Sequence, residues 1–137
     1  MPRLKEIYEE LDFVSDRIST QVRTIALSVL ALAWLFLAGG KGRPELPAQP
    51  GRPLLLGVAG VSVLVLVADY LQYVCGYLAT NAVRDAAEAA RKDTAEFDYG
   101  DWRYRARTGL FWLKQILTAV AAGGILFAVV EALLASQ

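Results

Sequence analysis

The sequence predicts an all-α integral membrane protein with three transmembrane helices and a cytoplasmic helical stalk. Three long apolar runs predict the spans, because about 20 apolar residues are needed to cross about 30 Å of hydrocarbon. Of the 137 residues, 55% are hydrophobic. A soluble bundle would carry polar residues along one face of each helix, whereas the run LLLGVAGVSVLVLVA has only Ser62. We therefore expect a single membrane domain over residues 1–137.

The N-terminal segment, residues 4–22, predicts an amphipathic helix in the cytoplasm. Its apolar residues recur at spacings of three and four, as in a coiled coil, and this assembly seam consists of Leu4, Ile7, Leu11, Val14 and Ile18. The other faces are acidic, whereas a helix lying on an anionic membrane would carry Lys and Arg, so we expect this helix to project into the cytosol. The seam can pack within the chain or against a second chain.

The remaining segments alternate between apolar spans and polar connections. In chain order they are a first span at 22–40, an outer loop at 41–52, a second span at 53–78 that continues as a cytoplasmic helix to residue 92, a return loop at 93–101 and a third span at 102–135. A helix over 53–92 would be about 60 Å long, about twice the hydrocarbon thickness. About half of it must then stand in the cytosol, beside the N-terminal helix, and the two form the predicted stalk. An acidic segment precedes the first span, so we expect that span to stay as an anchor and not to be cleaved as a signal peptide.

Lys and Arg are distributed unevenly over the flanks of the spans. Four lie before the first span and six between the second and third, which makes ten, whereas the outer loop has three, namely Lys41, Arg43 and Arg52. The positive-inside rule places the N-terminus in the cytoplasm and the C-terminus outside, as expected in a bacterial inner membrane. Arg103, Arg105 and Arg107 would lie at the lipid head groups, either as a positive-inside anchor or as ligands of anionic lipids.

Two ionisable residues, Asp69 and Lys114, interrupt the second and third apolar runs at comparable depths. Charged groups inside a span usually face the bundle and pair with one another, so we expect these two to pair. Neighbouring residues predict a polar pocket that opens toward the cytoplasm, and they are Gln72, Tyr73, Gln115 and Thr118. The pair is either a structural clamp between two helices or a site for an ion or proton.

Small residues predict close contacts between helices. They are Gly57 and Gly60 on the second span and Ala121, Gly124, Ala128 and Ala132 on the third. Such residues serve contacts within a chain and between chains equally well. Because three helices alone enclose little, we expect a homo-oligomer or a larger membrane complex.

The sequence predicts no catalytic residues, no metal site and no cofactor. Histidine is absent, which removes the commonest acid–base catalyst and the commonest zinc ligand, and Cys75 is the only cysteine. The 14 basic residues balance the 14 acidic ones, so a nucleic-acid partner is not expected.

The predicted topology is similar to that of the bacterial diacylglycerol kinases, which are small three-span proteins with a cytoplasmic N-terminal helix. That family carries a Glu-x-x-Asn-x-x-x-Glu run at the cytoplasmic end of its second span. The corresponding run here, YLATNAVRD, has Leu78, Asn81 and Asp85 at the three positions. The resemblance is one of topology, and it implies a lipid-modifying enzyme as a third possible function.

Together these features favour a non-enzymatic inner-membrane protein that oligomerises or docks a cytosolic protein through its stalk. It would act in the lipid bilayer as a membrane subunit or a pore-forming effector of a larger system. The alternative is a small ion channel or transporter that uses the Asp69 and Lys114 pocket.

The uneven distribution of Lys and Arg leads to a prediction of topology. A reporter that is active only in the cytoplasm should be inactive when fused after Gln137 and active when fused to the N-terminus. Reporter activity at the C-terminus would overturn the assigned orientation.

Overall fold

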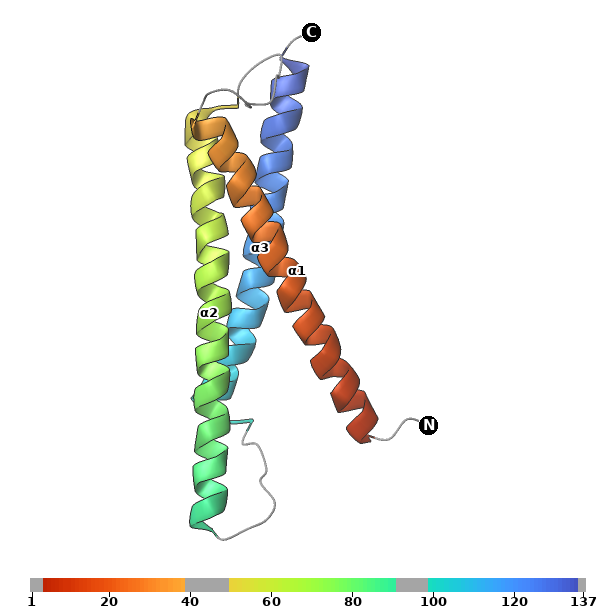
Figure 1. The fold of residues 1–137 in the computed structure, drawn as a ribbon, viewed down its shortest axis with the longest axis vertical. Helices are drawn as coiled ribbons and strands as arrows, with labels where there is room; N and C mark the ends of the chain where they lie inside the picture. The colour runs from red at the N-terminus through yellow and green to blue at the C-terminus, as the bar shows by residue number, and fades with distance from the viewer. Residues whose placement is uncertain (1–3, 39–49, 91–98, 136–137) are drawn as a thin grey trace.

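The computed structural model describes residues 4–38, 50–90 and 99–135, with side chains described from residue 12 onward, and these residues form three α-helices. They are α1 (Leu4–Ala38), α2 (Arg52–Ala89) and α3 (Trp102–Leu134). Each is long and apolar enough to cross a membrane. The prediction of an all-α fold with three helices of spanning length is thereby confirmed. Figure 1 shows the three helices running up, down and up in turn along one long axis.

α1 is one continuous helix where the sequence predicted two segments that meet at residue 22. No Gly or Pro occurs between Leu4 and Ala38, so nothing in the sequence interrupts the helix. Its exposed hydroxyl side chains donate to carbonyls one turn earlier, from Thr20 to Asp16 at 3.0 Å and from Ser28 to Thr24 at 2.8 Å. These bonds satisfy the hydroxyls within the helix, which suits an apolar environment.

Residues that commonly begin helices mark the starts of α2 and α3. Pro53 lies in the first turn of α2, where a missing N–H costs nothing. Asp101 is the N-cap of α3, and its carboxylate accepts a hydrogen bond from the backbone N–H of Arg103 at 3.0 Å. α2 ends at Ala89, and the last two residues of its predicted extension, like most of the predicted return loop, lie outside the described residues.

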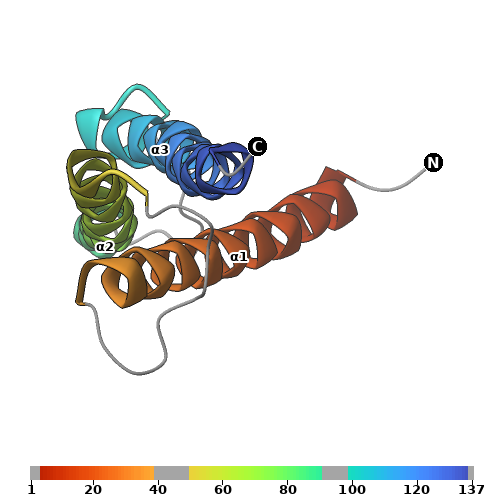
Figure 2. The same cartoon turned by 90° about the horizontal axis from the view of Figure 1, so that it is seen from above.

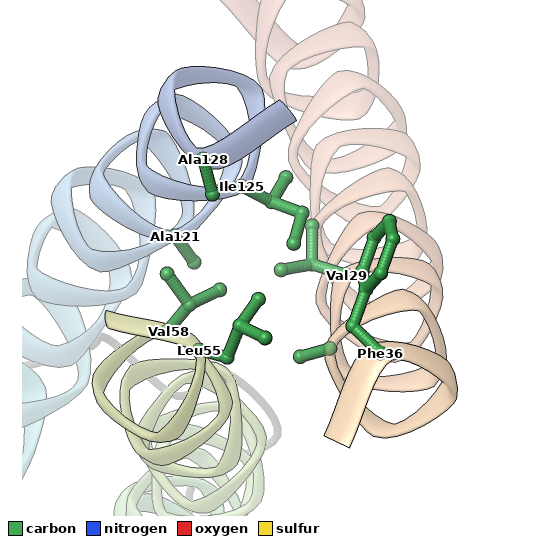
Figure 3. Packing of buried hydrophobic residues seen from close by; sticks show 8 residues of the cluster. Val29, Phe36, Leu55, Val58, Ala121, Ile125 and Ala128 are labelled. Carbon is green, nitrogen blue, oxygen red and sulfur yellow. The ribbon is translucent and has the colours of Figure 1, made fainter. Parts of the chain in front are cut away.

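An apolar core joins the three helices near the C-terminal ends of α1 and α3 and the N-terminal end of α2. Figure 3 shows its side chains meeting from all three helices: Val29, Ala33, Phe36, Leu55, Val58, Ala121, Ile125 and Ala128. A second, smaller group follows along the axis and consists of Val22, Ala26 and Val65. Ala121, Ala128 and Ala132 of α3 are buried, so α2 and α3 approach closely on the small-residue face that the sequence indicated.

The other predicted small residues face elsewhere. A Cβ atom added to Gly57 or Gly60 would meet no heavy atom within 4 Å, so neither residue lies against another helix of this chain. A role for them in contacts between chains stays a prediction.

α1 leaves the other two helices toward its N-terminus. Figures 1 and 2 show this divergence from two directions. The buried stripe of α1 ends at Ser19, while Phe13 and Val14 are 61% and 44% exposed. Of the described seam residues, Ile18 packs against the group of Val22, Ala26 and Val65, and packing of the whole seam on the extension of the second span stays a prediction. The side chains of Leu4, Ile7 and Leu11 lie outside the described residues.

The close approach of α2 and α3 gives a prediction of stability. A Cβ atom on Gly124 would lie 2.8 Å from Cγ2 of Val58, and this short branched side chain cannot move far. Gly124→Ala should therefore lower the thermal unfolding temperature in detergent, by the equivalent of about 1–3 kcal/mol.

Gly123→Ala is the matched control, because nothing lies within 4 Å of its Cβ position. Both changes carry the same gain in helix propensity, so their difference isolates the clash. An unfolding temperature of Gly124→Ala equal to or above that of Gly123→Ala would contradict the packing.

Candidate functional site

Three charged side chains, one from each helix, meet at the level where α1 begins to diverge. On α3, Lys114 is fully buried, and its Nζ lies 2.6 Å from Oδ1 of Asp69 on α2. The same Nζ donates a hydrogen bond to Oγ of Ser19 on α1 at 2.8 Å. The structure thus brings Asp69 and Lys114 together and adds a contact to the first helix that the sequence analysis did not identify.

The second carboxylate oxygen of Asp69 is also occupied. Nε of Arg23 on α1 lies 2.9 Å from Oδ2, and the Asp69 side chain is 6% exposed while that of Arg23 is 44% exposed. Arg23 also donates to the hydroxyl of Tyr73 at 3.0 Å, with its guanidinium carbon 5.4 Å from the centre of that ring. We call Ser19, Arg23, Asp69, Tyr73 and Lys114 the charge cluster.

Burial of a charge is costly unless partners replace its water, and the charge cluster supplies them. The ammonium of Lys114 has a carboxylate, a hydroxyl and, 5.6 Å away, the face of Phe111. The carboxylate of Asp69 has one cation on each oxygen. Two cations and one anion leave the cluster with one net positive charge, and its half-exposed member, Arg23, is the one that can reach solvent.

The remaining residues of the predicted polar pocket are placed differently from one another. Thr118 is buried, and its hydroxyl donates to the backbone carbonyl of Lys114 at 2.6 Å, within α3. Gln72 is 9% exposed, and its Oε1 has no hydrogen-bond partner among the described residues, which is also true of Nε2 of Gln115.

A pocket of about 670 Å³ fills the space between the diverging α1 and the other two helices. We call it the wedge pocket. Its inner end is formed by Ser19, Gln72 and Tyr73, so it adjoins the charge cluster. Farther out, Asp12 and Asp16 line it from α1, and Tyr77, Tyr104 and Arg107 line it from α2 and α3. Gln115 and Thr118 do not line it, so the pocket lies more toward α1 than the sequence predicted.

The three arginines expected at the head groups have separate environments. Arg103 lies 3.5 Å from the carboxylate of Asp101 and over the ring of Trp102. Arg105 is exposed, and Arg107 packs over Gly76, where a Cβ atom would lie 3.6 Å from its Cδ. Only Arg107 of the three lines the wedge pocket.

The positions compared with the diacylglycerol kinases lie near the end of α2, away from the charge cluster. Asp85 accepts a hydrogen bond from exposed Arg84 at 3.1 Å, and Leu78 is largely exposed. Among the described residues no group of three or more His, Cys, Asp or Glu is placed to hold a metal. In comparisons with known proteins, no family model, curated protein or solved structure matches the chain.

The pairing in the charge cluster predicts an order of stability among variants. Asp69→Leu should be the most destabilising, by about 3–5 kcal/mol, because it strands buried Lys114 and also releases Arg23. Lys114→Met should cost less, since Asp69 keeps Arg23. The double variant should be more stable than Asp69→Leu alone, as a thermal unfolding cycle in detergent would show.

The exposed pair of Arg84 and Asp85 is the control, and breaking it with Asp85→Asn should change stability by less than about 1 kcal/mol. Losses that simply add in the double variant of Asp69 and Lys114 would mean that the two residues do not stabilise each other.

Proposed function

We propose that this chain is a non-enzymatic integral membrane protein, with its N-terminus in the cytoplasm of a bacterial cell, that assembles with further copies of itself through the outer half of α1. One observation carries the proposal. The apolar seam Leu4, Ile7, Leu11, Val14 and Ile18 lies one residue out of register with the stripe of α1 that is buried from Ser19 to Phe36, and its member Val14 is 44% exposed where α1 has left the other helices. A stripe of this kind gains free energy only when another surface covers it.

The position of the charge cluster supports the membrane placement. Counted along the helices at 1.5 Å per residue, the cluster lies about 28 Å from the end of α1 (Ser19 to Ala38), about 26 Å from the start of α2 (Asp69 to Arg52) and about 30 Å from the end of α3 (Lys114 to Leu134). All three values match the hydrocarbon thickness of about 30 Å. In this placement the cluster lies at the cytoplasmic boundary, and the wedge pocket and the end of α2 lie beyond it.

The outer surface of the apolar layer supports the same placement. Large side chains point outward from all three helices, among them Trp34, Leu64 and Leu126. A protein in water would hide most of them, whereas lipid is their ordinary surrounding.

A second copy of the chain suits the exposed part of α1. The segment 4–18 has five acidic and two basic residues, and the start of α3 has Arg103, Arg105 and Arg107. The acidic faces of α1 in one copy therefore complement the basic start of α3 in another. Each large apolar residue of the seam would contribute about 1.5–3 kcal/mol when covered.

The test is the oligomeric mass of the purified protein in detergent, measured by light scattering. The paired change Leu11→Asp and Val14→Asp should lower the mass to that of one chain, because carboxylates cannot be buried in an apolar seam. Phe13→Asp is the matched control, since Phe13 lies on the same turn but off the seam and is 61% exposed. Its mass should equal that of the unchanged protein.

Two results would contradict assembly through α1. The unchanged protein could run as a single chain, or the paired Asp variant could keep its full mass. In the second case the outward-facing Gly57 and Gly60 would be the next contacts to change.

A small ion channel or transporter is the second candidate, and the buried charge cluster beside the wedge pocket is the observation that favours it. The complete pairing of Asp69 and Lys114 favours the clamp, because an ion would have to displace a partner at each step. Liposomes that contain the purified protein should therefore show no ion conductance that depends on Asp69. A conductance that is lost in Asp69→Leu would support the channel instead.

A further inference from the structure

The wedge pocket contains charges of both signs that do not meet. Asp12 and Asp16 line it from α1 and Arg107 lines it from α3, and none of the three forms an ion pair with another described residue. Unpaired charges on facing walls leave room for a ligand that carries both an anionic and a cationic group.

A buried acceptor lies in the wall of the same pocket. Gln72 is 9% exposed, and its Oε1 is buried without a hydrogen-bond partner, although buried amide oxygens are nearly always paired. Because Gln72 lines the pocket, turning its amide over would present this oxygen to a ligand with N–H groups, which would satisfy it. Four tyrosines also line the pocket, and Tyr99 and Tyr104 form an edge-to-face pair with ring centres 5.0 Å apart. Tyrosine hydroxyls can donate to phosphate oxygens, and tyrosine rings attract ammonium groups.

A second, smaller pocket adjoins the wedge pocket between α1 and α3, and we call it the apolar cleft after the three apolar side chains that it adds. Its volume is about 330 Å³, and it shares Asp12, Gln72 and Arg107 with the wedge pocket and adds Val14, Ile18 and Phe111. The second pocket therefore places apolar side chains beside the charged groups of the wedge pocket. Its size falls within the usual range of small-molecule sites, about 300–1,000 Å³.

We propose that the wedge pocket binds an ethanolamine phosphodiester, the head group of phosphatidylethanolamine. The ammonium lies between Asp12 and Asp16 and toward Gln72, the phosphate lies at Arg107, and the start of the glycerol backbone enters the apolar cleft. A glycerol head group has no cation for Asp12 and Asp16, and choline lacks the N–H donors that these carboxylates and Gln72 can accept. The choice of a lipid, and not a free phosphodiester, as the ligand rests on the membrane placement in the proposed function, which puts the pocket at the cytoplasmic head-group layer. It does not rest on self-association.

The experiment is lipid binding to the purified full-length protein in detergent, read by native mass spectrometry and by thermal unfolding. The probes are phosphatidylethanolamine, phosphatidylcholine and phosphatidylglycerol with identical acyl chains, and water-soluble glycerophosphoethanolamine. Phosphatidylethanolamine should bind about tenfold more tightly than either of the other lipids, the difference expected from one charged hydrogen-bonded contact. A similar affinity for the soluble compound would identify a free phosphodiester as an equally good source of the same chemistry.

Variants separate the two ends of the ligand. Asp16→Asn should weaken phosphatidylethanolamine more than phosphatidylcholine, because both lose a charge partner but only ethanolamine also loses a hydrogen bond, whereas Arg107→Gln should weaken both equally. Arg105→Gln is the matched control, because Arg105 is exposed and lies outside both pockets. Equal binding of the three lipids, a preference for phosphatidylglycerol, or equal effects of Arg107→Gln and Arg105→Gln would overturn the proposal. Since oligomeric mass plays no part in these readings, the lipid site and the assembly proposal can fail separately.

Discussion

The contact of Asp69 with two cations is the interaction on which the arrangement of the three helices depends. Its carboxylate lies on α2, and each of its oxygens binds a cation from a different neighbouring helix, Arg23 on α1 and Lys114 on α3. Apolar packing has little directional preference, whereas a buried charge must meet its partners at hydrogen-bond distance. The charge cluster therefore fixes how far each helix can slide along the others. The apolar core then fills the space on one side of it.

The divergence of α1 follows from where its buried contacts end. From Phe36 back to Ser19, α1 packs mostly small or branched side chains against α2 and α3. Over the same stretch Ser19 and Arg23 contribute their polar groups to the charge cluster. Before Ser19 it presents Asp12, Ser15 and Asp16 toward the other helices, and these cannot form an apolar contact. The wedge pocket is the result. The two proposals thus concern the same half-helix: the acidic face is for the polar end of a ligand, and the seam is for assembly, although its residues Val14 and Ile18 also line the apolar cleft.

The sequence predicted the helices well because strong local signals mark their limits. Pro53 and Asp101 stand at the starts of α2 and α3, and the spans differ sharply in composition from the segments between them. Asp69 and Lys114 were identifiable because each is the exception in an apolar run. Arg23 was missed because a cation at the edge of a span is common, and nothing local shows that it binds a carboxylate on another helix. The partner of Ser19 is likewise set by tertiary structure.

Features that depend on the angle between helices could not be predicted in the same way. Spacing alone places Gly57 and Gly60 on a helix face but does not say which neighbour that face meets, and among the described residues it meets none. The seam and the buried stripe from Ser19 to Phe36 have the same spacing of three and four residues, so spacing alone does not reveal that the stripe is buried in the bundle while Val14 of the seam is exposed. These outcomes depend on how all three helices pack at once.

The central claim is that Asp69 holds a buried, charged Lys114, and nuclear magnetic resonance of the lysine side chains tests it most directly. The chain has four lysines, at positions 5, 41, 92 and 114, so ¹⁵N-lysine labelling in lipid nanodiscs gives few signals. At neutral pH we expect one ammonium group whose hydrogens exchange slowly with water, and we expect Asp69→Asn to abolish that protection while the other three signals stay in place. Four rapidly exchanging ammonium groups in the unchanged protein would contradict the account.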